Sequence, residues 1–160
     1  MQQARELERY RTQLEWTGRG EQGTAAYASY GREYRVTIDG KPQIIGSASA
    51  RFRGDPALPN PEELLIAAVS ACHMLAYLAL CARNGVRVVE YEDAATGVLT
   101  LHADGRGSLS EIVLTPIVTI APDSDEALAL QLHETAHEQC FIANSCSVPI
   151  LHKPSIRHSV

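Results

Sequence analysis

The pattern of apolar and polar residues divides the chain into a strand-rich beginning, one long apolar helix, and a second half that mixes strands with a shorter helix. Alternating apolar positions in Tyr10–Trp16 predict a strand, although a helical spacing of apolar residues also fits this segment. The segments Thr24–Tyr30 and Arg32–Ile38 are rich in β-forming residues. Asp39-Gly40 is typical of a hairpin turn and predicts a further strand over Gln43–Arg53.

The long helix predicted between Asn60 and Gly85 has recognisable start and stop signals. Asn60 can cap the first turn, Pro61 suits the first helical position, and Glu63 completes a pair with Asn60 that resembles a capping box. Asn84-Gly85 is typical of a helix C-terminus, because glycine adopts the left-handed backbone conformation without strain.

The apolar run Leu64–Ala82 is long enough to raise the question of a membrane span. It carries Ser70, Cys72 and His73 at its centre and lacks a basic flank. We therefore interpret it as a fully buried helix of a soluble protein.

Strands and one further helix are predicted in the second half. Two long strands, Arg87–His102 and Ser110–Ala121, are joined by a turn around Ala103-Asp104-Gly105. A second helix is expected over Ser124–Gln139, with Asp123 or Ser124 as its cap, and the tail Ser147–Val160 is expected to return as a last strand. This order of elements predicts an α+β fold rather than an alternating parallel sheet.

Length and composition fit one soluble domain over residues 1–160, with a polar arm at residues 1–8. Hydrophobic residues make up 45% and charged residues 21%, which is ordinary for a folded protein. A formal net charge of −5 without a basic tract argues against a nucleic-acid-binding face. The N-terminus lacks the apolar core of a signal peptide, and four cysteines without an export signal indicate the reducing cytoplasm.

Cys72, in the middle of the long helix, is the first candidate for chemistry. A reactive thiolate so far from a helix N-terminus needs a cation beside it. Arg51 and Arg53 are candidates, because arginine stays charged when it loses water, and their spacing in a predicted strand puts both on one side. The simpler interpretation is that Cys72 is a small core residue.

Glu62 is the candidate carboxylate, because Glu63 already has a capping role. Ten helical positions separate Glu62 from Cys72 by ~15 Å, so the two cannot touch within one chain unless the helix breaks. A second copy of the chain could bring the two residues together. The alternative is a solvated carboxylate that the helix dipole favours.

The other three cysteines have different expected roles. Cys140 lies at the end of the second helix, where the dipole disfavours a thiolate, so it suits a resolving role better than an attacking one. Cys146 is a rival for that role. Cys81 is too far along the helix from Cys72 to form a disulfide with it and is expected in the core.

The segment His133–His137 spells the zinc-protease motif HExxH. With Cys140, its two histidines would share one helical face, so a zinc site is geometrically possible. No acidic residue follows Glu138 to supply the usual carboxylate ligand. We therefore expect no metal, two solvated or capping histidines in the motif, and a core or active-site polar role for His73.

Two segments resemble the OsmC/Ohr family of thiol-dependent peroxidases: NPEELLIAAVSAC with its continuation HMLAYLAL, and AHEQCFIANS. The resemblance spans Thr12–Val160 and accounts for the zinc-like motif. It implies an OsmC-like fold, with antiparallel sheets around two long central helices in an intertwined homodimer. The residues after Cys140 differ from those of the organic-hydroperoxide-resistance branch, so the chain is more similar to the OsmC-like branch.

The resemblance also implies roles for individual residues. Cys72 is similar to the peroxide-attacking cysteine, Cys140 to the resolving cysteine, and Glu62 to the acid of an arginine–glutamate pair. The segment ARFRG resembles the RFxG form of the arginine motif, which places the arginine at Arg51, whereas related sequences place it at Arg53; our prediction is Arg51.

The implied function is the reduction of organic hydroperoxides to alcohols, with no bound cofactor and with an external dithiol, such as a dihydrolipoyl group, as the reductant. Met74, Leu75 and Tyr77 are expected to line an apolar pocket for the peroxide. Two alternatives remain: a non-catalytic OsmC-like protein that binds a hydrophobic ligand, and a zinc-dependent hydrolase. Neither nucleic acid nor membrane is an expected partner.

Overall fold

The computed structural model describes residues 6–160, which form two compact units. The N-terminal unit extends to Pro61 and the C-terminal unit begins at Glu62. The polar arm expected at residues 1–8 lies mostly outside the described residues, and the single domain over residues 1–160 stays a prediction.

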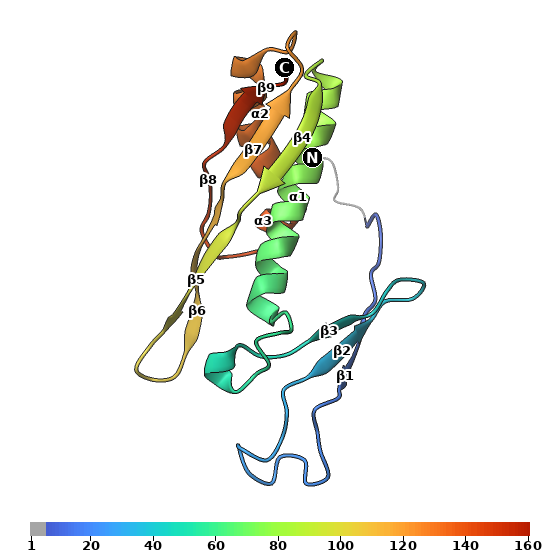
Figure 1. The fold of residues 1–160 in the computed structure, drawn as a ribbon, viewed down its shortest axis with the longest axis vertical. Coiled ribbons are helices and arrows are strands. Elements are labelled where there is room, and N and C mark those ends of the chain that lie inside the picture. The colour runs from blue at the N-terminus through green and yellow to red at the C-terminus, as the bar shows by residue number, and fades with distance from the viewer. Residues whose placement is uncertain (1–5) are drawn as a thin grey trace. The chain divides into compact units, whose positions relative to one another are not determined.

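The N-terminal unit is built on a three-stranded antiparallel sheet in the order β1-β2-β3 (Figure 1). The sheet and the short 3-10 helix after it comprise β1 (Gln13–Trp16), β2 (Tyr34–Thr37), β3 (Ile44–Gly46) and η1 (Ala50–Phe52). The predicted hairpin turn is confirmed, since Gly40 takes a positive φ of 72° between β2 and β3.

The prediction of β structure at Thr24–Tyr30 is wrong, because these residues form turns in the connection between β1 and β2. Gly20 and Gly23 in this connection take positive φ angles of 59° and 53°. The guanidinium of Arg32 lies 3.9 Å from the centre of the Tyr30 ring. The aromatic side chains that suggested a strand therefore pack locally around an arginine.

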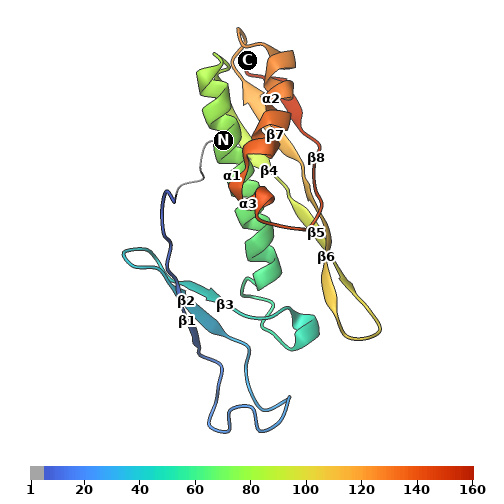
Figure 2. The ribbon, with the colours of Figure 1, turned by 180° about the vertical axis from the view of Figure 1, so that it is seen from behind.

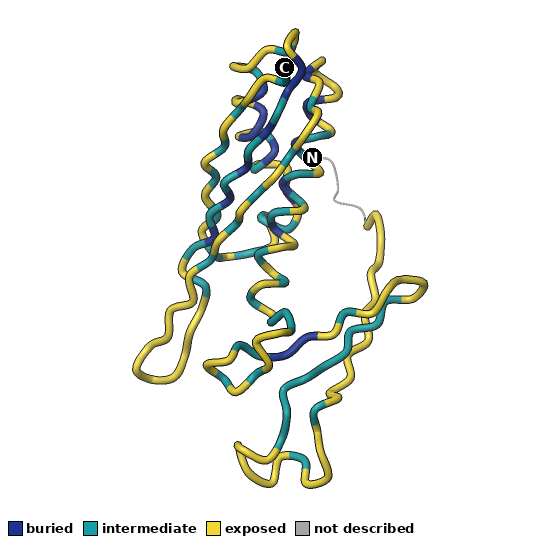
Figure 3. The backbone as a smooth tube through the Cα atoms, viewed as in Figure 1, coloured by how far each residue is buried: buried dark blue, intermediate teal, exposed yellow. Residues whose placement is uncertain are grey.

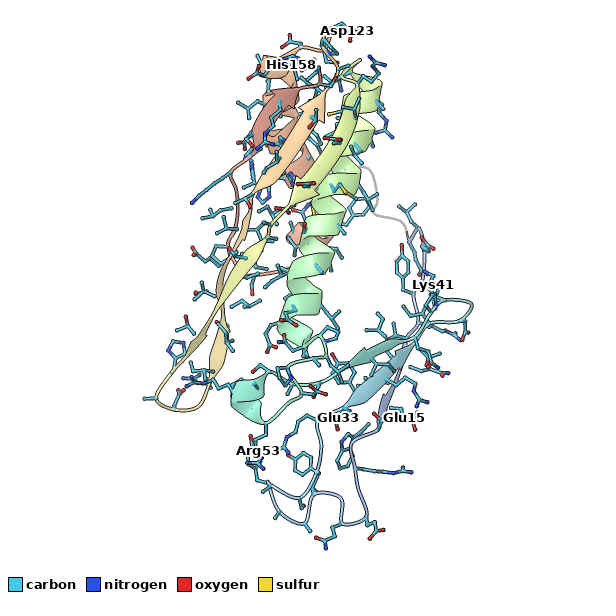
Figure 4. All side chains as sticks on the ribbon, in the orientation of Figure 1. Glu15, Glu33, Lys41, Arg53, Asp123 and His158 are labelled. Carbon is cyan, nitrogen blue, oxygen red and sulfur yellow. The ribbon has the colours of Figure 1, made fainter. Side chains whose placement is uncertain are left out.

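The strand predicted over Gln43–Arg53 ends at Gly46, and the chain then turns into η1. Arg51 lies within η1, and Arg53 follows it with a left-handed φ of 65°. The prediction that the two arginines share one side of a strand is therefore wrong. Figure 4 shows the labelled Arg53 side chain on the loop that follows η1.

The long helix α1 begins and ends close to the predicted residues and spans Pro61–Arg83. Pro61 occupies the first helical position, as expected. At the other end Gly85 takes a φ of 74°, and the Val86 N–H donates to the Cys81 carbonyl at 3.0 Å. This is the Schellman arrangement that the Asn84-Gly85 pair predicted.

Four strands replace the two long strands predicted after α1. They are β4 (Val88–Asp93), β5 (Thr96–Leu101), β6 (Gly107–Leu114) and β7 (Pro116–Ile120). The first predicted strand breaks between β4 and β5, and the second breaks between β6 and β7. A hydrogen bond links the two breaks, because the Asp93 carboxylate accepts from the Thr115 N–H at 2.7 Å. Pro116 has no N–H to continue the ladder of β6. Each predicted strand therefore passes from one sheet into another.

The tail likewise forms two strands rather than one, because Pro154 separates β8 (Ile150–His152) from β9 (Ser155–His158). The two sheets have the orders β4-β7-β9 and β5-β6-β8. β8 and β9 pair in parallel with their neighbours, so the expectation of purely antiparallel sheets is wrong in this detail. The α+β class is confirmed.

Two further helices lie between β7 and β8: α2 (Glu126–Gln139) and α3 (Phe141–Asn144). The cap of α2 is neither Asp123 nor Ser124, because the Asp125 carboxylate accepts the hydrogen bond from the Leu128 N–H at 3.0 Å.

The core of the C-terminal unit lies between these helices and the sheet β4-β7-β9. Figures 1 and 2 show α1 and α2 on one face of this sheet. The buried residues between them are Tyr77, Leu80, Cys81, Val86, Val118, Ile120, Ala129, Leu132 and Ala136. A second cluster, formed by Val69, Ile112 and Leu114, lies against the sheet β5-β6-β8.

Among residues 6–160, one side of α1 is buried (Figure 3). The buried residues recur every three or four positions and are Val69, His73, Tyr77, Leu80 and Cys81. By length and composition α1 could cross a membrane, with a mean hydropathy of 2.1 in its most apolar window, and 28% of that window is buried. The prediction of a fully buried helix is wrong for the single chain, because small residues such as Ala71 and Ala79 are exposed.

We expect Gly54→Ala to destabilise the protein more than Gly40→Ala. A Cβ atom at position 54 would lie 1.6 Å from the Ala48 carbonyl oxygen, so the backbone must move, at a cost of roughly 1–3 kcal/mol. Position 40 has open space, so alanine there costs only its left-handed strain, about 1 kcal/mol. Urea denaturation of both variants measures the difference, and equal losses would contradict a rigid loop at Gly54.

Candidate active site

Cys72 lies in the middle of α1, half-buried, at the edge of the buried side of the helix. Its side chain lines an open groove of about 860 Å³ between α1, the end of α2 and α3. The other lining residues are mostly small or apolar and comprise Ala68, Ala71, Leu75, Ala76, Ala79, Arg83, Glu138, Gln139, Phe141 and Asn144. The groove therefore offers an apolar surface next to a thiol.

Cys140 is the junction residue between α2 and α3 and is 1% exposed. Burial is the main reason that the pKa of its thiol is raised to about 11. The Ala143 N–H, 3.4 Å from Sγ, opposes this rise in pKa, whereas the nearby Cys72 thiol adds to it. From the sequence we predicted that the thiolate form of Cys140 is disfavoured, but we ascribed this to the dipole of α2 and not to burial.

The thiols of Cys72 and Cys140 are therefore near enough to interact, and both are free. They come from different helices that are far apart in the sequence. A disulfide between the two sulfur atoms would join the middle of α1 to the end of α2.

The apolar residues expected around the peroxide are only partly in the groove. Leu75 lines it and is 63% exposed. Met74 instead lines a second pocket of about 670 Å³, beside Tyr91 and Asp93. Tyr77 is fully buried and its hydroxyl donates to the Ala129 carbonyl at 3.1 Å. The prediction for Tyr77 is wrong, since it lies on the side of α1 that packs on the sheet.

Glu62 does not contact Cys72 within the chain. The helix α1 is continuous from Pro61 to Arg83, so the ten positions between the two residues correspond to ~15 Å. Glu62 is half-buried in the first turn of α1. Because the helix is unbroken, the two residues cannot touch within one chain, and a second copy of the chain could bring them together.

Arg51 and Arg53 are exposed residues of the N-terminal unit, at and just after η1. Arg51 in a 3-10 helix and Arg53 in a left-handed conformation differ from the strand in which they were expected. Their roles toward Cys72 stay predictions that rest on the family resemblance.

The two remaining cysteines lie in different surroundings. Cys81 is buried in the core between α1 and the sheet β4-β7-β9, which confirms its expected packing role. Cys146 is half-buried and lines a separate pocket of about 540 Å³ with residues such as Leu65 and Leu109. Cys146 is therefore absent from the groove that Cys72 lines, whereas Cys140 lies near enough to Cys72 to interact with it.

His73 and His133 form a buried pair between α1 and α2. His73 is 1% exposed, His133 is fully buried, and Nε2 of His73 lies 3.0 Å from Nδ1 of His133. The Tyr77 ring stacks on His133, with ring centres 3.8 Å apart. The expectation that both HExxH histidines are solvated or capping is wrong for His133, because its side of α2 faces the core.

His137 and His152 extend this pair into a cluster of four histidines. The ring centres of His73 and His152 are 5.6 Å apart, and those of His137 and His152 are 5.2 Å apart. Within residues 6–160, no three or more His, Cys, Asp or Glu side chains are arranged to hold a metal ion. The HExxH residues therefore do not fit the zinc site that the motif suggested.

Sequence reasoning missed the histidine cluster. Its one usable signal was the helical spacing of His133 with the apolar positions Ala129, Leu132 and Ala136, which places the imidazole on the buried side of α2. A histidine on such a side needs a polar partner, which His73 supplies from another helix.

These features define an α+β protein with two neighbouring free thiols, one in the middle of α1 and one between α2 and α3. A family model described as OsmC-like protein matches residues 54–153. The chain belongs to the OsmC family, as its sequence motifs indicated.

Solved structures agree with this assignment. An OsmC-like protein of unknown function from Vibrio cholerae is 30% identical, with a TM-score of 0.83 over 93% of this chain and 100% of that one. An organic hydroperoxide resistance protein from Elizabethkingia anophelis is 20% identical, with a TM-score of 0.70 over 98% of this chain and 100% of its own. A Legionella pneumophila organic hydroperoxide resistance protein is 17% identical, with a TM-score of 0.69 over 96% and 99%. At these last two identities the likeness shows the fold. No protein with a curated functional description matches the chain.

We expect the free energy of unfolding to fall as the pH drops below about 6.5. Burial lowers the pKa of His73 to about 4 and that of His133 to about 3, from an ordinary value of 6.5. At pH values between 6.5 and these lowered pKa values, the unfolded chain binds more protons than the folded one. The stability is thus fully present above pH 6.5 and declines on acidification by up to roughly 1.4 kcal/mol per pH unit for each histidine.

Urea denaturation from about pH 7.5 to about pH 4.5 tests this slope. The His133→Asn variant should show a shallower decline, because one of the two buried titrating groups is removed. His102→Asn, on the exposed β5–β6 turn, is the matched control and should keep the slope of the unaltered protein. A pH-independent free energy of unfolding would contradict a neutral buried pair.

Proposed function

We propose that the protein is a thiol-dependent peroxidase that reduces organic hydroperoxides, with Cys72 as the attacking and Cys140 as the resolving cysteine. The observation that carries this proposal is the proximity of two free thiols, of which Cys72 lines an apolar groove and Cys140 is buried beside it. Two of the similar solved structures are named organic hydroperoxide resistance proteins, which supports the same class of substrate.

The proposed reaction has three steps. The Cys72 thiolate attacks the outer oxygen of the peroxide, so the O–O bond breaks, the alcohol leaves after taking a proton, and Cys72 becomes a sulfenic acid. The Cys140 thiol then attacks the sulfenic sulfur, which forms the disulfide and releases water. An external dithiol reduces this disulfide to two thiols and is itself oxidised, so the dithiol supplies both electrons.

The surroundings of the two cysteines favour this order of attack. Cys140, with its raised pKa and 1% exposure, is protonated at neutral pH and shielded from a dissolved peroxide. Cys72 lines the open groove, where Leu75 and Phe141, 63% and 77% exposed, offer apolar surface to an organic peroxide. A small polar peroxide gains nothing from that surface.

An arginine–glutamate pair would activate the thiol. We assign the cation to Arg51, which would stabilise the Cys72 thiolate, and the carboxylate to Glu62, which would orient the guanidinium through a bidentate pair. The ~15 Å of unbroken helix between Glu62 and Cys72 favours a homodimer in which one chain's Glu62 serves the other chain's site.

The wider setting follows from the same chemistry. We propose a dihydrolipoyl group or another external dithiol as the reductant and no bound cofactor. A reducing cytoplasm would keep all four cysteines as thiols between turnovers, consistent with their free state.

A second candidate function is binding of a hydrophobic ligand without catalysis. The groove of about 860 Å³ beside Leu75 and Phe141 favours it, because a ligand could cover this exposed apolar surface. The two functions differ in one respect, which is whether the Cys72 thiol is consumed by a stoichiometric organic hydroperoxide.

We expect Cys72→Ser to abolish dithiol-dependent turnover of cumene hydroperoxide. The hydroxyl of serine cannot form the sulfenic acid on which the cycle depends. The matched control is Cys81→Ala, which removes a thiol from the core of the same helix and should retain turnover. Peroxide consumption with dihydrolipoamide as donor is the readout, and full activity of Cys72→Ser would overturn the proposal.

We expect Arg51→Gln to slow the oxidation of Cys72 about hundredfold, because the thiolate loses its stabilising cation. Arg53→Gln is the matched control in the same loop and should change the rate only slightly. The rate of thiol loss after mixing with cumene hydroperoxide is the measurement. A large effect of Arg53→Gln with none of Arg51→Gln would move the assignment to the second arginine.

A further inference from the structure

We propose that His73 and His133 are positioning residues that set how readily the Cys72–Cys140 disulfide forms. The two imidazoles act through the helices that carry the thiols and not on the peroxide itself. The inference rests on the proposed function, because it assigns a role in the resolving step to a buried pair that the peroxidase cycle leaves unused.

Polar contacts join α1 to α2 at two adjacent helical turns. Nε2 of His73 lies 3.0 Å from Nδ1 of His133, and one turn further along α1 the Tyr77 hydroxyl donates to the Ala129 carbonyl at 3.1 Å. Four positions separate the two contacts on each helix, so one turn of α1 matches one turn of α2. The two contacts together fix the register of the helices and the rotation of α2 about its own axis.

The imidazole pair holds this geometry more strictly than apolar packing could. A hydrogen bond weakens steeply when its angle changes, whereas apolar burial has no preferred direction. The other two ring nitrogens, Nδ1 of His73 and Nε2 of His133, are buried without a partner among residues 6–160. The 3.0 Å contact is therefore the hydrogen bond on which both imidazoles depend, and its loss leaves further unpaired polar atoms in the core.

The pair is well placed to control the two thiols. Cys72 directly precedes His73 on α1, and Cys140 follows His133 by seven positions, which is ~10 Å along a helix. Because α2 is continuous between His133 and Gln139, a small rotation of this helix at His133 displaces Cys140. A disulfide tolerates only Cα separations of about 4.4–6.8 Å, so such a displacement changes how often the two thiols meet.

This link has a measurable consequence for the chemistry. The equilibrium between dithiol and disulfide reports the effective concentration of the Cys140 thiol at Cys72. Loss of the imidazole hydrogen bond should lower that concentration, raise the reduction potential of the disulfide and slow the attack of Cys140 on the sulfenic acid. The earlier attack of Cys72 on the peroxide does not use the Cys140 thiol, so its rate should not change.

The first test measures the reduction potential of the full-length protein in buffers of lipoamide and dihydrolipoamide, without peroxide. Two hydrogen atoms pass from the protein to lipoamide when the disulfide forms, and free thiols are blocked with N-ethylmaleimide and located by peptide mass spectrometry. We expect His133→Leu to lower the effective concentration about tenfold, which raises the potential by about 30 mV. An unchanged potential in His133→Leu would overturn the proposal.

The conservative variant His133→Asn should restore the potential of the unaltered protein. The bonding atom of His133 is Nδ1, and the side-chain amide of asparagine occupies nearly the same position and can keep the hydrogen bond to His73. A potential in His133→Asn as high as that in His133→Leu would contradict a role for this hydrogen bond.

A second comparison separates positioning from stability. The double variant His73→Leu/His133→Leu leaves no imidazole unpaired, so it should be more stable than His133→Leu, yet its potential should stay about 30 mV high. The matched control is Val118→Ala in the buried core of β7, which should lower the stability and leave the potential unchanged. A potential that follows the free energy of unfolding across these variants would reduce the pair to a structural role and overturn the proposal.

Rapid mixing with cumene hydroperoxide tests the same role within the peroxidase cycle. In His133→Leu the loss of the Cys72 thiol should keep its rate, while disulfide formation slows about tenfold and the sulfenic acid accumulates. Equal slowing of both steps would overturn the positioning role. The expected shifts in lipoamide buffer, without any reaction of peroxide, would support the positioning role and overturn the peroxidase proposal alone.

Discussion

The buried hydrogen bond between His73 and His133 is the contact on which the geometry of the candidate site depends. It joins α1 to α2, and each partner is close to one of the two thiols: His73 is the residue after Cys72, and His133 precedes Cys140 by seven positions, about two helical turns. Because the imidazole pair fixes how the two helices face each other, it also fixes the meeting of the thiols. The neutral pair avoids the cost of a buried charge, and the Tyr77 ring covers one face of His133.

The same packing explains why the two cysteines differ. The buried side of α1 faces the sheet, and Cys72 lies at the edge of that side, where the groove begins. Cys140 ends α2 inside the structure, so burial holds its thiol in the protonated form at neutral pH. A half-buried thiol in an open groove beside a shielded one suits the proposed peroxidase, because the first thiol can react with substrate before the second one does. Cys146 lies outside this pair and opens to another pocket.

Much of the fold could be predicted from local signals, and the failures have common causes. The bounds of α1 followed from Pro61 and Gly85, whose backbone preferences are intrinsic to the residue. The division of the two long strands could not be foreseen, because it depends on the Asp93 carboxylate binding the Thr115 N–H from a distant strand. The loss of a strand before Arg53 has a similar cause, since the close approach of Gly54 to Ala48 is a tertiary contact.

For the site, the sequence motif predicted Cys72 and Cys140, while their proximity depends on the packing of α1 on α2. The histidine cluster stayed hidden because its members lie on three elements and its chemistry resembled a metal motif.

The central claim is that Cys72 and Cys140 act as a redox pair toward organic hydroperoxides. The most direct test is the intact mass and thiol content of the protein after one equivalent of cumene hydroperoxide. The account predicts the loss of two hydrogen atoms and two free thiols per peroxide in the unaltered protein, and a trapped sulfenic acid at Cys72 in Cys140→Ser. An unchanged mass with four free thiols in the presence of the peroxide would contradict it.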